Sequence, residues 1–128
     1  KPDVHQVVKS HETFGGKHVN GVLLVAKRFR DANPKICQAV LAAQNEANAF
    51  IRADARKAAE FYLKITGDKR SSLDDMTRII SDPDNDYTTV PLHTMKFAEF
   101  MHATGSLKKK PASWKDLYFP EIHDVQGS

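Results

Sequence analysis

One short loop carries the residues whose types and spacing are best suited to binding a ligand. Thr13 and Phe14 precede a pair of glycines, Gly15 and Gly16. Paired glycines let the backbone turn sharply and let a ligand come close to its amides, and successive exposed amides can hold an anion. The loop is therefore a candidate anion site, although the spacing alone favours a simple loop that connects two strands.

No recognisable catalytic or metal-binding pattern is present elsewhere. The six histidines are scattered, whereas a metal site needs tightly spaced or convergent ligands. The single cysteine, Cys37, cannot form an internal disulfide and lies in a helical stretch. A nucleophile elbow, a P-loop and a dinucleotide fingerprint are all lacking. We therefore expect no enzyme activity, no cofactor and no bound metal.

The composition is that of an ordinary soluble globular protein, with 41% apolar and 27% charged residues and a formal charge of +3. No stretch approaches the roughly 18 apolar residues of a membrane span. Only Lys108, Lys109 and Lys110 form a basic cluster, and a nucleic-acid binder shows a denser stripe. Nucleic-acid binding is not expected, while a mild positive balance suits a small anionic ligand.

Two strands are predicted before the helical part of the chain. Residues 4–8 are rich in valine. Residues 19–26 form a continuous apolar run, which is typical of a strand covered on both faces. Because two strands make only a marginal sheet, we expect them to need partners from elsewhere, and the chain to be an incomplete domain.

The first of four predicted helices is long and begins at an Asn-Pro pair. Asn33 can cap the free amides, and Pro34 is tolerated at the first helical position. The helix is expected to end near Arg52. Its apolar face repeats at helical spacing and consists of Ile36, Val40, Ala43, Ala47 and Phe50.

Three shorter helices follow, each with one apolar face. Asp54 is expected to cap the second helix and Gly67 to end it, while Ser72 begins the third. Pro91 opens the fourth, which Gly105 ends. Two strands cannot cover four apolar helix faces, so a larger sheet is expected to lie mostly outside this chain.

The tail from residue 111 to 128 is expected to be irregular, with one helical turn at residues 113–117. Trp114, the only tryptophan, stands there among other apolar residues. The expected role of this cluster is to pin the C-terminal tail to a folded body.

Three stretches of the sequence resemble one family of transport proteins. Residues 13–23, Thr-Phe-Gly-Gly-Lys-His-Val-Asn-Gly-Val-Leu, resemble the Gly-Gly…Asn…Val-Leu segment of solute-binding proteins of nitrate/sulfonate/taurine-type ABC importers. Residues 29–34 are similar to that family's Phe-x-x-x-Asn-Pro helix entry. Residues 95–124 resemble the C-terminus of one branch of these proteins.

The resemblance implies an α/β fold class, with the chain forming the C-terminal portion of a two-lobed periplasmic-binding-protein-like fold. This portion would be mostly helical with about two strands. Residues 1–18 would supply a strand and loop of the second lobe. Residues 19–128 would supply a hinge-crossing strand, four helices and the tail that completes the first lobe.

The implied function is capture of a small anionic or zwitterionic solute in the periplasm, by a free protein or a lipoprotein. The loaded receptor would then be presented to the ABC permease. Thr13 and Asn20 would offer polar contacts to the solute and Phe14 an apolar wall. Gly15 and Gly16 would allow close backbone approach, and no bond would be broken.

Two other functions remain open on the sequence alone. The chain could be a stand-alone helical protein-interaction module, which binds a partner through its helix faces. It could also be an enzyme related to thiamine-precursor synthesis, which shares the binding-protein fold but needs a reactive histidine and a cofactor. If the chain is truncated, exposed apolar surface is expected to drive dimerisation.

Overall fold

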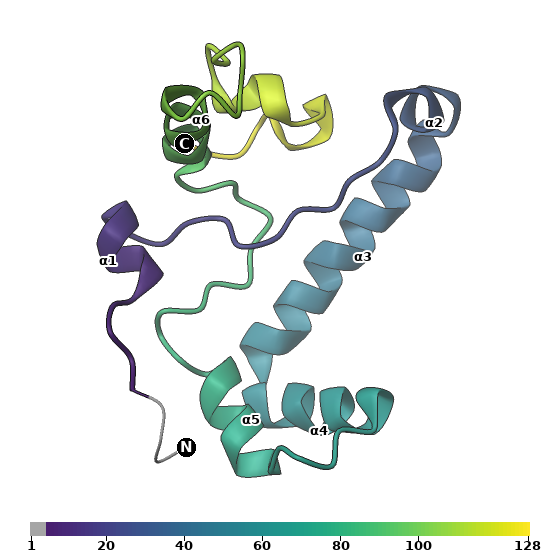
Figure 1. The fold of residues 1–128 in the computed structure, drawn as a ribbon. Helices are drawn as coiled ribbons and strands as arrows, with labels where there is room; N and C mark the ends of the chain where they lie inside the picture. The colour runs from purple at the N-terminus through teal and green to yellow at the C-terminus, as the bar shows by residue number, and fades with distance from the viewer. Residues whose placement is uncertain (1–4) are drawn as a thin grey trace. The chain divides into compact units, whose positions relative to one another are not determined.

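The computed structural model describes residues 5–128, and the regular structure within that range is entirely helical (Figure 1). The helices are α1 (Ser10–Phe14), α2 (Lys27–Ala32), α3 (Pro34–Ala53), α4 (Ala55–Thr66), α5 (Leu73–Ile80) and α6 (Thr94–Ala103), followed by the 3-10 turns η1 (Trp114–Leu117) and η2 (Pro120–Ile122). None of these described helices has the length and apolar content needed to cross a membrane.

The expected α/β fold class with about two strands is therefore wrong for this chain. Residues 19–26, predicted as a strand, have no regular structure, and Leu24 is 91% exposed. Of the other predicted strand, residue 4 lies outside the described residues and residues 5–8 are irregular and exposed. A strand exists only where a second strand pairs with it. The amide of Val19 does donate to the carbonyl of Leu92, at 3.0 Å, but no ladder follows.

The chain divides into two compact units. The first comprises the described residues 5–23 together with Val90–Ser128, and the second comprises Leu24–Thr89. The first unit contains α1, α6, η1 and η2, and the second contains α2 to α5. The sequence predicted a different kind of boundary, between residues 18 and 19, where the two lobes of a receptor would meet. That boundary stays a prediction.

In the second unit, the Asn-Pro pair separates α2 from α3. Pro34 occupies the first position of α3, and the helix ends at Ala53, one residue past the expected Arg52. The expected capping role of Asn33 is wrong: its carboxamide donates instead to the Phe29 carbonyl in α2, at 3.0 Å. Asn33 therefore closes the preceding helix, and the fixed φ of Pro34 starts the next.

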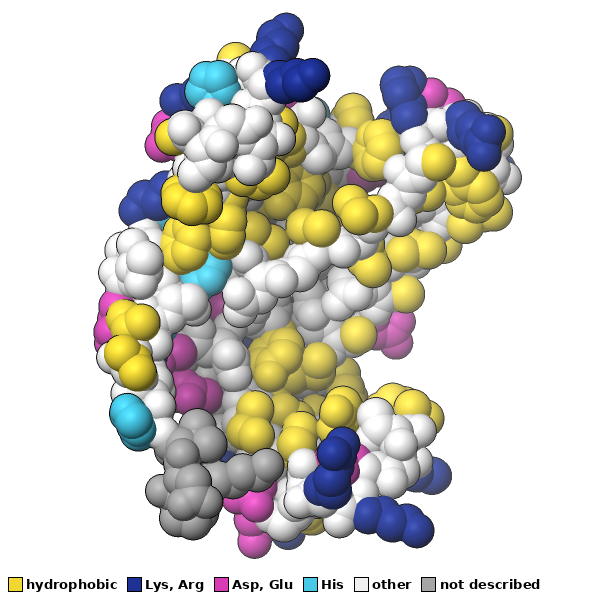
Figure 2. All heavy atoms as spheres, in the orientation of Figure 1, with side chains coloured by type: hydrophobic (Ala, Val, Ile, Leu, Met, Phe, Trp, Pro, Cys, Tyr) yellow, Lys and Arg dark blue, Asp and Glu magenta, His cyan; other side chains and the backbone are white. Residues whose placement is uncertain are grey.

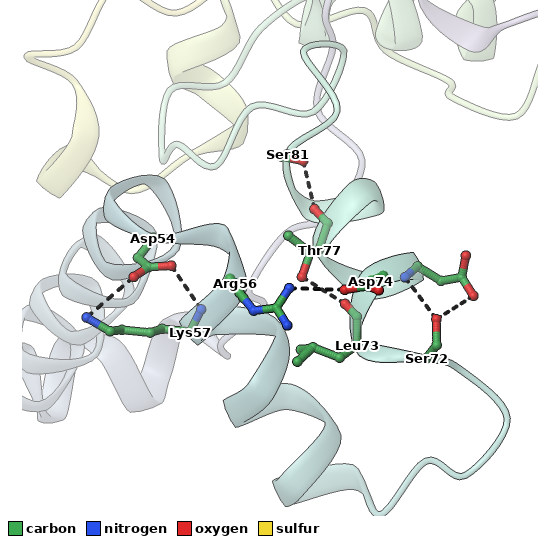
Figure 3. Close-up of polar contacts among 9 residues, drawn as sticks. Asp54, Arg56, Lys57, Ser72, Leu73, Asp74, Thr77 and Ser81 are labelled. Atoms are coloured by element: carbon green, nitrogen blue, oxygen red, sulfur yellow. Dashed lines mark hydrogen bonds and ion pairs between the residues drawn. The ribbon is translucent and has the colours of Figure 1, made fainter.

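The ends of α4 follow the expected capping chemistry. The Asp54 carboxylate accepts a hydrogen bond from the Lys57 amide at 3.0 Å, as Figure 3 shows. That contact satisfies one of the free amides in the first helical turn. At the other end, Gly67 adopts a left-handed conformation with φ of 63° and donates its amide to Leu63. Glycine has no Cβ, so it adopts the left-handed conformation without a steric penalty. This conformation ends the helix.

Helix α5 begins at Ser72, as expected, and packs on α4. The Ser72 hydroxyl oxygen accepts from the Asp75 amide at 3.1 Å. Ala58 and Ala59 are the buried residues of α4, which packs against both α5 and α3. Arg56 pairs with Asp74 at 3.0 Å across the two helices (Figure 3), although both side chains are exposed and such pairs contribute little stability.

Much of the apolar surface of the second unit is open. Figure 2 shows hydrophobic side chains gathered along α3 and beside α4. The exposed large apolar residues of α3 and α4 are Ile36, Val40, Phe50, Phe61, Tyr62 and Ile65. Phe50 and Phe61 meet edge to face with ring centroids 6.3 Å apart, so the stripes of α3 and α4 are continuous. Only alanines fill the buried apolar positions of this unit.

In the first unit, α6 starts later than the sequence indicates. The helix begins at Thr94 rather than at Pro91 because His93 has a positive φ of 53°, which is incompatible with a helical turn. The helix ends at Ala103, two residues before the expected Gly105, whose φ is 78°.

The tail is anchored as the sequence predicts. Trp114 is 8% exposed at the start of η1, the expected helical turn. Its indole meets the rings of Tyr118 and His123 edge-on, at 6.0 and 5.8 Å. Ser113 caps the turn, with its hydroxyl accepting from the Lys115 amide. These contacts give the tail a small core of its own.

Candidate functional site

The candidate loop forms the C-terminal end of α1. Gly15 has φ of 73° and Gly16 has φ of 147°, so both glycines occupy conformations that other residues rarely adopt. The Gly15 amide donates to Glu12 at 3.4 Å, and the Gly16 amide donates to His11 at 2.8 Å. Both amides therefore bond to carbonyls of α1, and an anion at this loop would have to be held by other donors.

Three rings support the loop from one side. Phe14, half-buried at the end of α1, stacks on the imidazole of His18 with centroids 4.5 Å apart. The ring of Phe97 lies 4.3 Å from Phe14 and 5.7 Å from His18. The Nδ1 atom of His18 is buried and has no hydrogen-bond partner among the described residues. Phe14 therefore packs against Phe97 of α6, and its expected role as an apolar wall for a solute stays a prediction.

The first turn of α6 and its N-cap hold the loop backbone. The ammonium of Lys96 donates to the carbonyl oxygen of Phe14. The Nδ1 atom of His93 lies 2.7 Å from the carbonyl oxygen of Lys17. Lys96 and Phe97 lie on α6 itself, and His93 is its N-cap residue. The loop is thereby fixed to α6 and its N-cap by two polar contacts and by the two ring contacts of Phe97.

The two expected polar contacts, Thr13 and Asn20, are both exposed. The Thr13 amide donates to Lys9 at 3.5 Å, within the first turn of α1. Asn20 follows Val19 in the irregular segment, just past the bond from Val19 to Leu92. Their side chains stay available for a ligand, and their role remains a prediction.

Positive charge at the loop comes from Lys17, which follows Gly16, and from Lys96, which lies one turn before the acidic residue Glu99. Glu99 pairs with Lys110 at 2.8 Å, and the Lys110 ammonium holds the pKa of the Glu99 carboxyl below its usual value. Glu99 is therefore ionised and compensated by Lys110 at neutral pH. The carboxylate of Glu12 accepts from the Lys9 amide at 3.3 Å, at the far end of α1.

Sequence reasoning missed His18, His93, Lys96 and Phe97. Nothing in the sequence shows that Lys96 and Phe97 of α6, or His93 at its N-cap, meet the loop after α1. Within residues 5–128, no three His, Cys, Asp or Glu side chains gather as a metal site would require.

The comparisons with known proteins found no relative of this chain. No protein-family model matches the chain, and neither a curated protein nor a solved structure matches it.

Proposed function

We propose that this chain is part of the extracytoplasmic solute-binding component of an ABC importer for a small anionic or zwitterionic solute of the nitrate, sulfonate or taurine kind. The observation that carries the proposal is the fixed loop at Phe14, which has the ammonium of Lys96 on its backbone. The resemblance of residues 13–23, 29–34 and 95–124 to such receptors supports it.

The chemistry proposed is binding without reaction. Because the conformation of the loop is already fixed, the loop loses little conformational entropy when a solute binds. With the amides of Gly15 and Gly16 used by α1, the donors offered to a solute are the Thr13 hydroxyl, the Asn20 carboxamide and the Lys96 ammonium. An ammonium among neutral donors favours an anion over a neutral solute of the same size.

Amide chemical shifts in nuclear magnetic resonance spectra test the proposal directly. Nitrate, methanesulfonate and taurine are titrated at constant ionic strength, with chloride as the reference salt. We expect saturable shifts at residues 13–20 with at least one of the three solutes, and weaker binding in Lys96→Gln. Lys109→Gln removes an equal charge from the exposed basic cluster and should leave binding unchanged. A folded chain whose loop amides do not respond to any of the three solutes contradicts the proposal.

A second candidate function rests on the open apolar surface of the second unit. Six large apolar side chains of α3 and α4 are exposed, and the Phe50–Phe61 ring contact joins the two stripes. Large exposed apolar patches mark surfaces that another polypeptide covers. A helical protein-interaction module, acting through α3 and α4, fits this surface.

Mass measurement separates the second candidate from a monomer with an inert surface. Light scattering after size-exclusion chromatography is run over a range of concentrations, on the native chain and on the double variant Phe61→Asn/Ile65→Asn. These two side chains are 59% and 69% exposed, so the substitutions should leave the fold intact. Association that rises with concentration and disappears in the variant supports an interaction surface. A native chain that stays monomeric throughout argues against self-association through it.

A further inference from the structure

We infer that His93 is a positioning residue that ties the candidate loop to the start of α6, and that Ser128 of the tail holds His93 in place. Loop order and tail docking are then coupled through one side chain. This inference deepens the proposed function because it concerns the loop on which solute binding rests. Its contacts all lie within the first unit.

The backbone of His93 is the first observation. His93 is the only residue other than glycine with a positive φ among the described residues, at 53°. A non-glycine residue in the left-handed region stays there only where its surroundings determine it. Glycine would adopt this backbone conformation at a lower steric cost. We therefore infer that histidine is present here for the contacts of its imidazole ring.

The imidazole makes two contacts with the loop. Its Nδ1 lies 2.7 Å from the Lys17 carbonyl oxygen. Because a carbonyl only accepts, Nδ1 must carry the proton. Its Cε1 would lie only 3.0 Å from a Cβ added at Gly16. The ring therefore fills the space that the absent side chain of Gly16 leaves, directly beside the carbonyl it binds.

The tail makes the matching contacts from the other side. The His93 amide donates to the Ser128 hydroxyl at 2.9 Å, and the Thr94 amide donates to the Ser128 carbonyl at 2.6 Å. The Ser128 amide in turn donates to the Pro91 carbonyl at 2.8 Å. Ser128 thus takes part in three hydrogen bonds around His93. These hydrogen bonds keep His93 in its left-handed conformation.

Three substitutions separate the imidazole from the backbone. His93→Gly relieves the positive φ and removes the ring. His93→Asn tolerates the left-handed region and keeps an amide that can reach a carbonyl. Ser128→Ala removes the hydroxyl that accepts from His93, and Ser106→Ala, in the loop after α6, is its matched control.

Backbone ¹⁵N relaxation of residues 14–19 reports loop order, and the fluorescence of Trp114 reports unfolding of the first unit. We expect His93→Gly to lower the loop order parameters while the unfolding midpoint holds or rises. We expect His93→Asn to keep the loop ordered. Ser128→Ala should also lower the loop order parameters, by a smaller amount. Ser106→Ala should leave them unchanged. An unchanged loop in His93→Gly overturns the inference, as does a loop that loosens equally in Ser106→Ala.

A double-mutant cycle tests the contact with Gly16. Gly16→Ala is destabilising because of its φ and because its Cβ meets the His93 ring. In the His93→Gly background the ring is absent, so Gly16→Ala should lower the unfolding midpoint by less. Equal shifts in the two backgrounds would show that His93 and Gly16 are independent.

Solute titrations then connect the positioning role to binding. If the native chain binds an anion, His93→Gly should weaken that binding while Lys109→Gln does not, with both variants folded. Unchanged anion affinity in His93→Gly overturns the positioning role. If the native chain binds none of the solutes, the proposed function fails, while the relaxation and double-mutant data still decide whether His93 fixes the loop.

Discussion

Gly127 lies against the face of Trp114, so that a Cβ added to the glycine would come within 2.7 Å of the indole Cε2. The same Cβ would lie 2.8 Å from Cγ of Pro91. Neither neighbour is the end of a flexible side chain. The only tryptophan of the chain is thus buried under a residue that must have no side chain.

Gly127→Ala should therefore destabilise the first unit by about 1–3 kcal/mol, the usual cost of overpacking. Chemical denaturation followed by Trp114 fluorescence measures this cost at the site itself. Gly21→Ala is the matched control, because no atom lies within 4 Å of its added Cβ. Equal midpoints for the two variants would show that Gly127 is not packed against the indole.

Ala59→Leu should separate α4 from its neighbours. Ala59 is 0% exposed, and a leucine there needs room that the helices do not have. We expect a loss of about 1–3 kcal/mol from the free energy of unfolding. Ala42→Leu, at an exposed position of α3, is the control and should have little effect. Circular dichroism at increasing denaturant follows both, and a neutral Ala59→Leu would contradict the tight packing of α4.

Ser72→Ala should weaken α5 through its first turn. The variant leaves the Asp75 amide without the hydroxyl that accepts its hydrogen bond, at a cost of about 1 kcal/mol. Ser72→Asn, which also caps helices well, should recover most of the loss. Thermal unfolding of the two variants provides the comparison. If asparagine fails to restore what alanine removes, the serine acts by something other than capping.

Helix α4 should lose stability in acid through Asp54. The hydrogen bond from the Lys57 amide is the main cause that holds the pKa of this carboxyl below its ordinary value of 3.8. A lowered folded-state pKa contributes stability above 3.8, and this contribution is lost as the pH falls from there through the folded value. Asp54→Asn keeps a cap that does not titrate, so its helicity should fall less in that pH window. Parallel acid titrations of circular dichroism that coincide would exclude this role.

Local signals in the sequence predicted the helices well. Pro34, Asp54, Gly67 and Ser72 act within one turn of the chain, and each marks the helix boundary that the structure has. Each of these signals acts on backbone groups within one turn of the chain, so it can be recognised from the local sequence alone. Asn33 shows the limit, because its side chain donates to the Phe29 carbonyl of the preceding helix instead of capping α3.

The strands and the site depended on distant partners, and there the sequence was a poor guide. An apolar run at residues 19–26 forms a strand only if another strand lies beside it, and the described residues contain no such strand. In the same way, Thr13, Phe14, Gly15 and Gly16 were predicted as a loop, but Thr13 and Phe14 belong to α1 and only the glycines follow the helix. His93 and Lys96 could not be assigned to that loop, because the sequence does not show that α6 folds onto α1.

The division of the chain also sets an order of assembly during synthesis. All of the second unit is contiguous, whereas the first unit joins residues 5–23 to Val90–Ser128. A ribosome that adds about 5–20 residues per second synthesises the whole of α2 to α5 before it begins α6. The segment that carries α1 must therefore wait, without its partner, until the tail emerges.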